Sequence, residues 1–562
     1  MNLSGDELKL GRREGNNDPR RMAIYLVLIV LFGALLALQQ TGQVQPLFLG
    51  TPIATRNAGS YADEAQAHFS SGDLEAAIAS YQQAAELDPN NPEWWARLAR
   101  VQVYRSSLLT TLDERRAQLA EARQSIENAV AANDQDPFSQ TIRALVYDWS
   151  ASAEVKDKIL EGDTVLVQAT VSDGGELTAR VIQLVNSATP SEIEPSQEQG
   201  EATGIFTGVV EIQRLNEWII SGRVVRLSDE TIQVVNRREE FLLEALQSAT
   251  FATTLDPNNP LGLAFKAEVH VDQGQVALAA DLARQAVESI EAAGEDYEYA
   301  MDVYRVYGTV LENQGLYLQA IIQYQNAVSY SPNLTFLYLQ IGVNYRKLRQ
   351  IDEALDNFAT AAQINQQLGI EDPNPYLSIG RTYAQQGDFF IAALNMERAL
   401  AIDPNNPELY AQLGTVYFQA RNYESSIPIF ECAVEGCSDD QAREYLCTLE
   451  IMPCEDGVPV RTDVEGAEEE FNYEVTGLEL NSRSLPYYYT YGSALTFFAG
   501  SDTYPNACQR AEAVFSELMA SYGDDPTTAA IVAEGRQVCA STAAQPQSTI
   551  PPIPTVTPSP SP

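Results

Sequence analysis

The amino-acid sequence predicts a mainly α-helical protein: a stack of helix–turn–helix repeats with a small β-rich insertion and one N-terminal membrane helix. Three observations lead to this prediction. Alanine-rich amphipathic runs recur at a regular spacing through most of the 562 residues. Between residues 155 and 238 the spacing of apolar residues changes from helical to alternating. One uncharged apolar run lies close to the N-terminus.

The N-terminal apolar run, from Met22 to Leu38, is typical of a membrane anchor. It contains no charge, and at about 1.5 Å per residue it spans about 25 Å, near the lower limit for a bilayer. Four arginines precede it: Arg12, Arg13, Arg20 and Arg21. The positive-inside rule therefore places residues 1–21 in the cytoplasm and the repeats on the extracytoplasmic side of the cell membrane. A cleaved signal peptide is the alternative.

Three copies of Asp-Pro-Asn-Asn-Pro, at 88–92, 256–260 and 403–407, mark boundaries between helix pairs. Each follows one alanine-rich run and precedes another. Proline ends the first of these helices and is tolerated in the first turn of the next. Asparagine supplies turn and N-cap hydrogen bonds.

The spacing inside one repeat is clearest between residues 301 and 332. A first helix places these residues on one face: Tyr304, Tyr307, Gly308 and Leu311. After a turn at Gly315, a second helix presents Ala320, Tyr324 and Ala327. This pattern resembles the tetratricopeptide repeat (TPR), of a bacterial membrane-anchored type, with a period of about 34 residues. Similar spacing covers most of residues 59–437, about eight repeats, and the resemblance implies a TPR α-solenoid, or superhelix.

The insertion, residues 155–238, divides the repeats into an N-terminal part (59–154) and a central part (239–437). It interrupts one repeat, whose two helices are expected at 138–152 and 239–255. Candidate strands are 163–171, 177–185, 206–213, 217–227 and 231–235, with a polar linker at 186–203. They favour a small barrel or curled sheet, and weakly resemble a small uncharacterised bacterial β-barrel domain. Its role is either ligand binding or that of a rigid spacer or dimerisation element.

The C-terminal region, 438–542, is predicted to be a cysteine-containing helical cap. Helices are expected at 484–498, 506–522 and 527–539, after an acidic loop at 455–483, and residues 543–562 form a disordered Pro/Ser/Thr-rich tail. Six cysteines, an even number in an extracytoplasmic region, indicate disulfides. We favour the pairs Cys432–Cys437, Cys447–Cys454 and Cys508–Cys539, although the sequence cannot choose among the possible pairings. Zinc binding is the alternative, disfavoured because paired C-x-x-C units are absent.

The composition argues against several functions. With 77 acidic and 35 basic residues the formal net charge is −42, so phosphate backbones would repel the chain and nucleic acid is not an expected partner. We find no catalytic or nucleotide-binding motif and only two histidines. His68 and His270 occupy positions that usually hold core aromatics. We therefore predict no enzyme activity, no cofactor, no metal site and no small-molecule ligand.

The predicted function is that of a non-catalytic, membrane-anchored scaffold. The TPR resemblance implies that a protein or peptide ligand lies against the first helices, whose candidate binding residues are Arg305, Gln340, Arg346, Lys347, Arg381 and Gln412. Basic residues are scarce, so their convergence favours acidic or carboxylate groups; pairing with neighbouring Asp and Glu is the alternative. Two other functions stay open: a cell-wall or carbohydrate-binding envelope protein that uses the β insertion, and a non-catalytic subunit of an envelope enzyme complex.

Overall fold

The computed structural model describes residues 23–24, 26–30, 56–154, 158–159, 162–172, 174–185, 191, 194–198, 201–214, 216–228, 230–293, 297–460 and 471–543. The chain divides into two compact units, 1–57 and 58–562. Within the described residues we find no helix that is long and apolar enough to cross a membrane. The predicted anchor lies outside the described residues except for 23–24 and 26–30, and so do residues 544–562 of the predicted tail.

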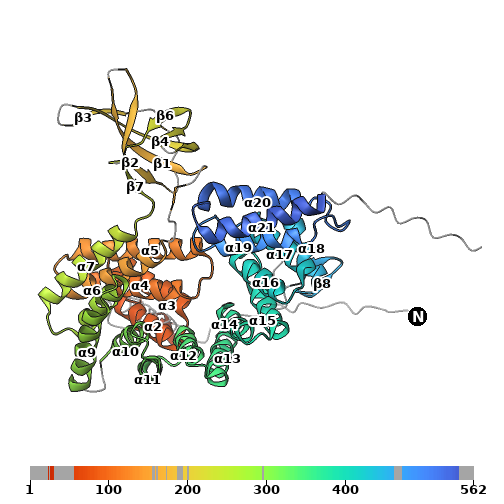
Figure 1. The fold of residues 1–562 in the computed structure, drawn as a ribbon. Helices are drawn as coiled ribbons and strands as arrows, with labels where there is room; N and C mark the ends of the chain where they lie inside the picture. Colours follow the sequence, from red (N-terminus) through yellow and green to blue (C-terminus); the bar gives the residue numbers. More distant parts are fainter. Residues whose placement is uncertain are drawn as a thin grey trace, which may run out of the picture. The chain divides into compact units, whose positions relative to one another are not determined.

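Consecutive helix pairs build the larger unit (Figure 1). They are α2 (Ala58–Ser71) with α3 (Leu74–Leu87), α4 (Pro92–Ser106) with α5 (Leu112–Ala132), α6 (Pro137–Ser152) with α7 (Arg238–Leu255), α8 (Pro260–Asp272) with α9 (Val276–Ala293), α10 (Ala300–Asn313) with α11 (Tyr317–Tyr330), α12 (Thr335–Lys347) with α13 (Ile351–Leu368), α14 (Asn374–Gln386) with α15 (Phe389–Ile402), and α16 (Pro407–Gln419) with α17 (Tyr423–Val434). The predicted mainly α fold is confirmed. Helices α6 and α7 pack together although the β insertion separates them in sequence.

The three Asp-Pro-Asn-Asn-Pro motifs start helices in the way that their residue types predict. The second asparagine of each motif is an N-cap: Asn91 accepts from the amide of Glu93, Asn259 from that of Leu261 and Asn406 from that of Glu408. The proline that follows lies in the first turn of α4, α8 and α16. Because these amides have no partner inside the helix, the caps stabilise each new repeat locally.

Glycines in the first helices allow aromatic rings of the second helices to approach closely. A Cβ atom added at Gly342 would lie 2.4 Å from a ring carbon of Phe358, and one at Gly308 would lie 2.8 Å from the ring of Tyr324. Both rings are buried. The small residue and the large one therefore form a matched pair that sets the distance between the two helices of a repeat.

We expect Gly342→Leu to destabilise the chain by about 1–2 kcal/mol net, because overpacking outweighs the gain in helix propensity. The matched control is Gln340→Leu on the same helix, where the side chain is exposed. Denaturant midpoints of the full chain measure both changes. A Gly342→Leu midpoint equal to or above that of the control would contradict the packing argument.

The β insertion contains β1 (Thr164–Val171), β2 (Leu177–Leu184), β3 (Glu194–Glu198), β4 (Glu201–Arg214), β5 (Glu217–Ile220), β6 (Arg223–Arg226) and β7 (Ile232–Val234). The strand order is β1-β2-β6-β5-β4-β3, with additional pairings of β1 with β4 and of β7 with β2. Its core includes Val165, Phe206, Trp218 and Ile220. The predicted insertion is confirmed, whereas its closure into a barrel stays a prediction.

Two details of the predicted strands are wrong. The polar linker expected at 186–203 contains β3 and the start of β4. These two strands pair with each other, and Glu194 lies opposite Ile205. Backbone hydrogen bonds hold these two strands together. Such bonds leave no trace in the spacing of apolar residues, so the sequence pattern did not predict the strands. The single strand expected at 217–227 is a hairpin, because Ser221 and Gly222 both have positive φ and reverse the chain.

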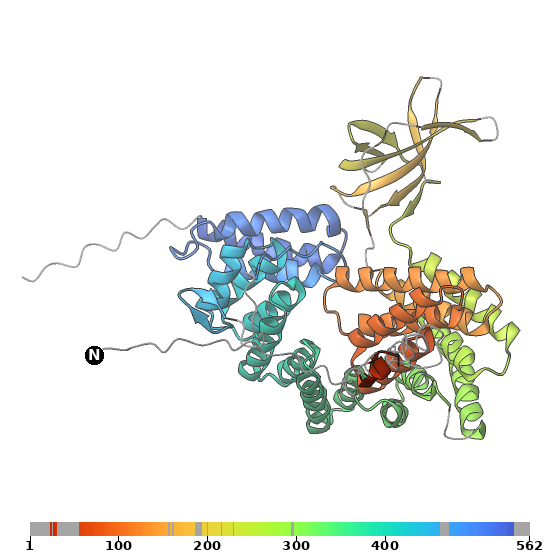
Figure 2. The same cartoon turned by 180° about the vertical axis from the view of Figure 1, so that it is seen from behind.

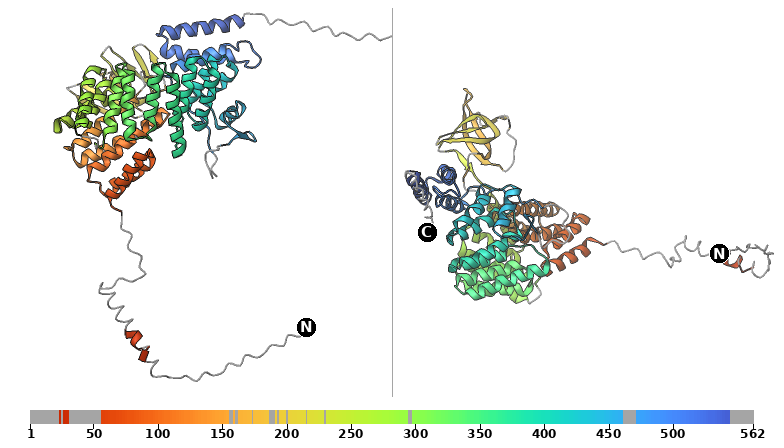
Figure 3. Two further views of the ribbon diagram at one scale, coloured as in Figure 1. Left: turned by 90° about the horizontal axis from the view of Figure 1, so that it is seen from below. Right: turned by 90° about the vertical axis from the view of Figure 1, so that its right-hand side faces the viewer.

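The C-terminal region contains α18 (Asp439–Thr448), β8 (Cys454–Glu455), β9 (Val458–Pro459), α19 (Leu485–Thr496), α20 (Ala507–Tyr522) and α21 (Pro526–Ala543). Helices α19, α20 and α21 pack together beyond the last repeat (Figures 1 and 3). The acidic loop expected at 455–483 is not wholly solvated, because Tyr473, Val475 and Leu480 are buried; residues 461–470 of that loop lie outside the described residues.

The six cysteines form three disulfides: Cys432–Cys437, Cys447–Cys454 and Cys508–Cys539. These are the pairs that the sequence favours. Two are local, and Cys508–Cys539 joins α20 to α21. No group of three or more metal-ligating side chains lies together within the described part of the chain.

Candidate functional site

The first helices of the N-terminal and middle repeats meet each other through a buried ion pair. Arg100 on α4 binds Asp302 on α10 with Nη2 and Oδ2 2.6 Å apart, and the exposed fractions of the two side chains are 4% and 0%. Tyr104, one turn after Arg100, donates a hydrogen bond to Asp302. Helix α4 therefore lies beside α10 and α12, which are far from it in sequence (Figure 2).

More side chains fill the same region. Arg305 on α10 donates to both carboxylate oxygens of Glu268 on α8, at 2.7 and 2.6 Å. Trp149 on α6 donates to Glu268 at 3.2 Å, and the ring of Tyr104 stacks on Phe336 of α12 at 5.5 Å. Arg305 is therefore not available to a ligand, and its prediction as a binding residue is wrong. It neutralises a neighbouring carboxylate instead.

Carboxyl groups crowd the same interior. Burial, with Asp272 and Glu268 nearby, raises the pKa of Asp148 well above its ordinary value. Burial and then Glu268 raise the pKa of Asp272 to about 6. Both groups favour the neutral form more than free aspartate does. The hydrophobic interior of this half therefore also contains a buried polar network.

The first helices α12, α14 and α16 present a different surface, in which basic side chains reach solvent. Arg381 on α14 is exposed and donates through Nε to Oε1 of Gln412 on α16, at 2.7 Å. Arg346 at the end of α12 lies 3.5 Å from the carbonyl oxygen of Ser378 and from the hydroxyl of Thr382. Burial and then Arg381 lower the pKa of Arg346. Arg346 is half-buried and Gln412 is buried, so Arg381 is the most exposed of the three. We call the face of α12, α14 and α16 that carries Arg346 and Arg381 the first-helix surface.

The other two predicted residues of α12 contribute less. Lys347 lies 2.7 Å from the carboxylate of Glu312 on α10, so it already has an acidic partner. Gln340 is exposed on the same helix. Arg305 and Lys347 therefore pair with neighbouring acidic residues, which was the alternative to ligand binding. Arg346 and Arg381 do not form such pairs within the described part of the chain.

Sequence reasoning missed the continuation of this surface beyond the last repeat. Tyr487, in the first turn of α19, donates to Glu408 of α16 at 2.9 Å, and Glu408 also accepts from Gln412 at 3.3 Å. Burial and then Glu408 raise the pKa of Tyr487, while Arg381 and Arg483 act in the opposite direction. Arg483 is exposed. In the sequence, Arg483 stands just before a predicted helix. That position alone does not show which part of the protein the helix packs against.

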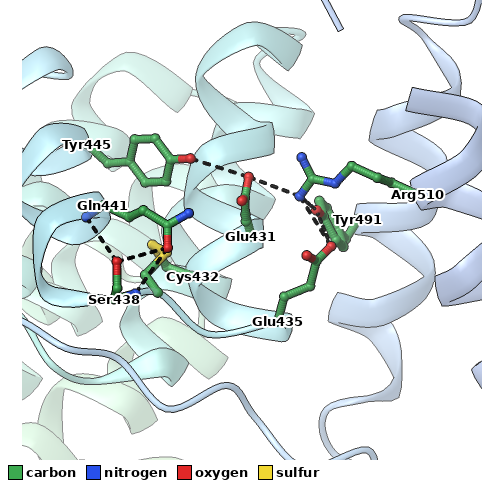
Figure 4. Close-up of a disulfide and its surroundings, with 9 residues drawn as sticks. Glu431, Cys432, Glu435, Ser438, Gln441, Tyr445, Tyr491 and Arg510 are labelled. Atoms are coloured by element: carbon green, nitrogen blue, oxygen red, sulfur yellow. Dashed lines mark hydrogen bonds and ion pairs between the residues drawn. A yellow bond between two sulfur atoms is a disulfide. The ribbon is translucent and has the colours of Figure 1, made fainter. Parts of the chain in front are cut away.

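A polar network attaches the C-terminal cap to the last repeat (Figure 4). Arg510 of α20 lies 3.0 Å from Glu431 on α17 and 3.2 Å from Glu435, the residue that follows α17. Tyr491 of α19 donates to Glu435 at 2.7 Å, and Tyr445 of α18 donates to Glu431 at 3.4 Å. The Cys432–Cys437 disulfide holds the end of α17 beside these groups. The cap is therefore held in place on the same stack of helices that carries the first-helix surface.

The TPR repeat family model matches residues 65–103 and 380–420. Similar solved structures include YrrB, a TPR protein with an unusual peptide-binding site, at 22% identity over 33% of this chain and 85% of that one, with a TM-score of 0.25. The C-terminal part of a TPR repeat-containing protein from Cytophaga hutchinsonii has 14% identity over 52% and 95%, with a TM-score of 0.33. A thermophilic TPR protein of Thermus thermophilus has 19% identity over 32% and 92%, with a TM-score of 0.27. No curated protein matches the chain.

Proposed function

We propose that this chain, which carries TPR repeats, is a protein-interaction scaffold that binds a segment of its partner on the first-helix surface. TPR repeats support a role in protein interaction. The observation that carries the choice of surface is the contrast between the two halves of the stack. Arg100, Asp302 and Arg305 are buried among their own partners, whereas Arg381 reaches solvent. Of these first-helix arginines, a partner segment can therefore reach Arg381, whereas Arg100 and Arg305 are covered.

The scaffold is anchored by residues 22–38 and its repeats lie on the extracytoplasmic side of the membrane. Two observations support this part of the proposal. Arginines precede the apolar run and the segment that follows it is uncharged. All the cysteines are in disulfides, which persist in oxidising compartments and are rare in reducing ones. The role is one of binding and needs no cofactor.

The test is capture of a cross-linked partner from membranes by the tagged full chain. We expect Arg346→Glu combined with Arg381→Glu to abolish the capture, because it places acidic groups where the partner segment meets basic ones. The matched control is Arg398→Glu, which makes the same charge change at an exposed position on α15. Equal capture by the double variant and the control would contradict the proposal. Retention on cell-wall polymer that is lost on deleting residues 155–238 would favour a wall-binding protein instead.

A further inference from the structure

Three aromatic rings from three separate elements meet on the surface where the last repeat joins the C-terminal cap. The ring of Tyr423, at the start of α17, stacks on that of Phe497, the residue that follows α19, with centroids 3.9 Å apart and an interplanar angle of 8°. The ring of Phe418, on α16, lies 5.4 Å from Tyr423 and 6.1 Å from Phe497. We call these three residues the aromatic surface.

The aromatic surface keeps binding capacity that the packing of the cap does not use. Phe497 is 57% exposed although it stacks on Tyr423, and an apolar ring in water gains free energy when a ligand covers it. One exposed apolar side chain is ordinary on a protein surface, but a cluster of aromatic rings marks an interaction site. The hydroxyl of Tyr423 makes no hydrogen bond within the described residues. The surface therefore offers both an open ring and a hydrogen-bond donor.

The C-terminal segment 544–562 has the composition that such a surface binds. It contains seven prolines and no charged residue. Proline-rich sequences favour the polyproline II helix, whose backbone carbonyl groups have no hydrogen bonds inside the helix. Such helices dock on aromatic surfaces, where rings pack against the prolines. Because the formal net charge of the chain is −42, an uncharged segment also approaches the protein without electrostatic repulsion.

This segment starts close to the aromatic surface. Helix α21 passes beside the residue that precedes Phe497, because a Cβ atom added at Gly535 would lie 3.4 Å from Cγ2 of Thr496. From Gly535 to the end of α21 at Ala543 the helix rises about 12 Å, at about 1.5 Å per residue. A polyproline II segment from Ala543 to Pro551 spans about 25 Å, at about 3.1 Å per residue. The prolines from Pro551 onwards can therefore reach Phe497.

We propose that residues 544–562 bind to the aromatic surface of the same molecule. The prolines between 551 and 554 pack against the open ring of Phe497, and a backbone carbonyl group of the segment accepts a hydrogen bond from the hydroxyl of Tyr423. This contact goes beyond the scaffold role and is independent of the first-helix surface. It attaches the C-terminal segment across the junction between the last repeat and the cap.

The test uses the full chain with a site-specific protease sequence inserted after Ala543, which is cut once the chain has folded. A labelled peptide with the sequence of residues 544–562 reports binding by fluorescence anisotropy. We expect the peptide to bind the cut chain, from which the original segment has been removed, and to bind the uncut chain at least about tenfold more weakly. A segment on a short linker has an effective concentration of about 1 mM, so it competes by this factor for any Kd below about 100 μM.

Two matched pairs identify the contact. Phe497→Ser in the cut chain should weaken binding of the peptide at least about tenfold, the scale of removing a central aromatic contact. Phe390→Ser makes the same change at a ring of α15 that is 82% exposed, and it should leave the affinity unchanged. A peptide with its seven prolines replaced by serine should not bind, because it loses the preference for polyproline II. Thermal unfolding verifies that each variant is folded.

Several results would overturn the inference. The first is the absence of peptide binding to the cut chain below about 1 mM; others are equal binding of the serine peptide, or equal affinities of Phe497→Ser and Phe390→Ser. Equal binding to the cut and uncut chains would assign the aromatic surface to a proline-rich segment of another protein. A molar mass that rises with the concentration of the uncut chain and falls on cutting would place the segment on a second copy.

Discussion

Asp302→Ala is expected to lower the free energy of unfolding of the repeats by about 3–5 kcal/mol, the cost of leaving one partner of a buried ion pair alone. The side chain of Asp302 is completely buried and pairs with Arg100. Alanine would leave the guanidinium of Arg100 in the interior without its carboxylate, and would remove the acceptor of the Tyr104 hydroxyl. Chemical denaturation of the full chain, followed by the fluorescence of Trp149 beside this network, measures the change.

The matched control is Glu75→Ala, which breaks the pair of Arg105 with Glu75. That glutamate is 80% exposed, so we expect a loss below about 1 kcal/mol. Replacing both buried partners, as Arg100→Met with Asp302→Leu, should recover much of the stability lost in Asp302→Ala, since no unpaired charge stays buried. A loss in Asp302→Ala no larger than that in Glu75→Ala would show that α4 and α10 do not depend on this pair.

Removing the Cys508–Cys539 disulfide, by replacing both cysteines with serine, is expected to destabilise the C-terminal cap by about 3.7 kcal/mol. The value follows from the entropy that a cross-link removes from the unfolded chain, for a sequence separation of 31. Helices α20 and α21 should then unfold at lower temperature than the repeats. Calorimetry of the full chain, combined with limited proteolysis, measures this separation.

The control is the same replacement at Cys447–Cys454, whose sequence separation is only 7. The shorter loop predicts a smaller loss, about 2.4 kcal/mol. A reducing agent added to the unmodified chain should reproduce the lower cap transition of the Cys508→Ser, Cys539→Ser variant. If both double variants unfold at the temperature of the unmodified chain, neither disulfide limits the stability of the cap.

The local features of this protein could be predicted from sequence because each depends on residues that are close together along the chain. An N-cap such as Asn406 acts on an amide two residues away. The contact of Gly342 with Phe358 lies within one helix pair. Alternating apolar residues identify the β insertion through the two faces of its strands. Even the interrupted repeat could be predicted, because α6 and α7 carry the residue spacing of a first and a second helix of one repeat.

The binding surface was only partly predictable. Sequence spacing assigned Arg305 and Arg381 alike to the ligand-facing side of first helices, but the structure buries the first and exposes the second. Arg483 was missed because nothing local shows that the start of α19 continues the surface of α16.

The sequence by itself therefore determined the repeat, its caps, the insertion and the position of the cysteines, since turns, caps and periodicity are short-range effects. Only the tertiary structure decided which first helices are covered by other parts of the chain and which remain open to a partner. Each repeat adds a small rotation to the one before it, and the sum decides that α4 meets α10. The Arg100–Asp302 pair, 202 residues apart in sequence, is a product of that accumulated geometry, which no single repeat contains.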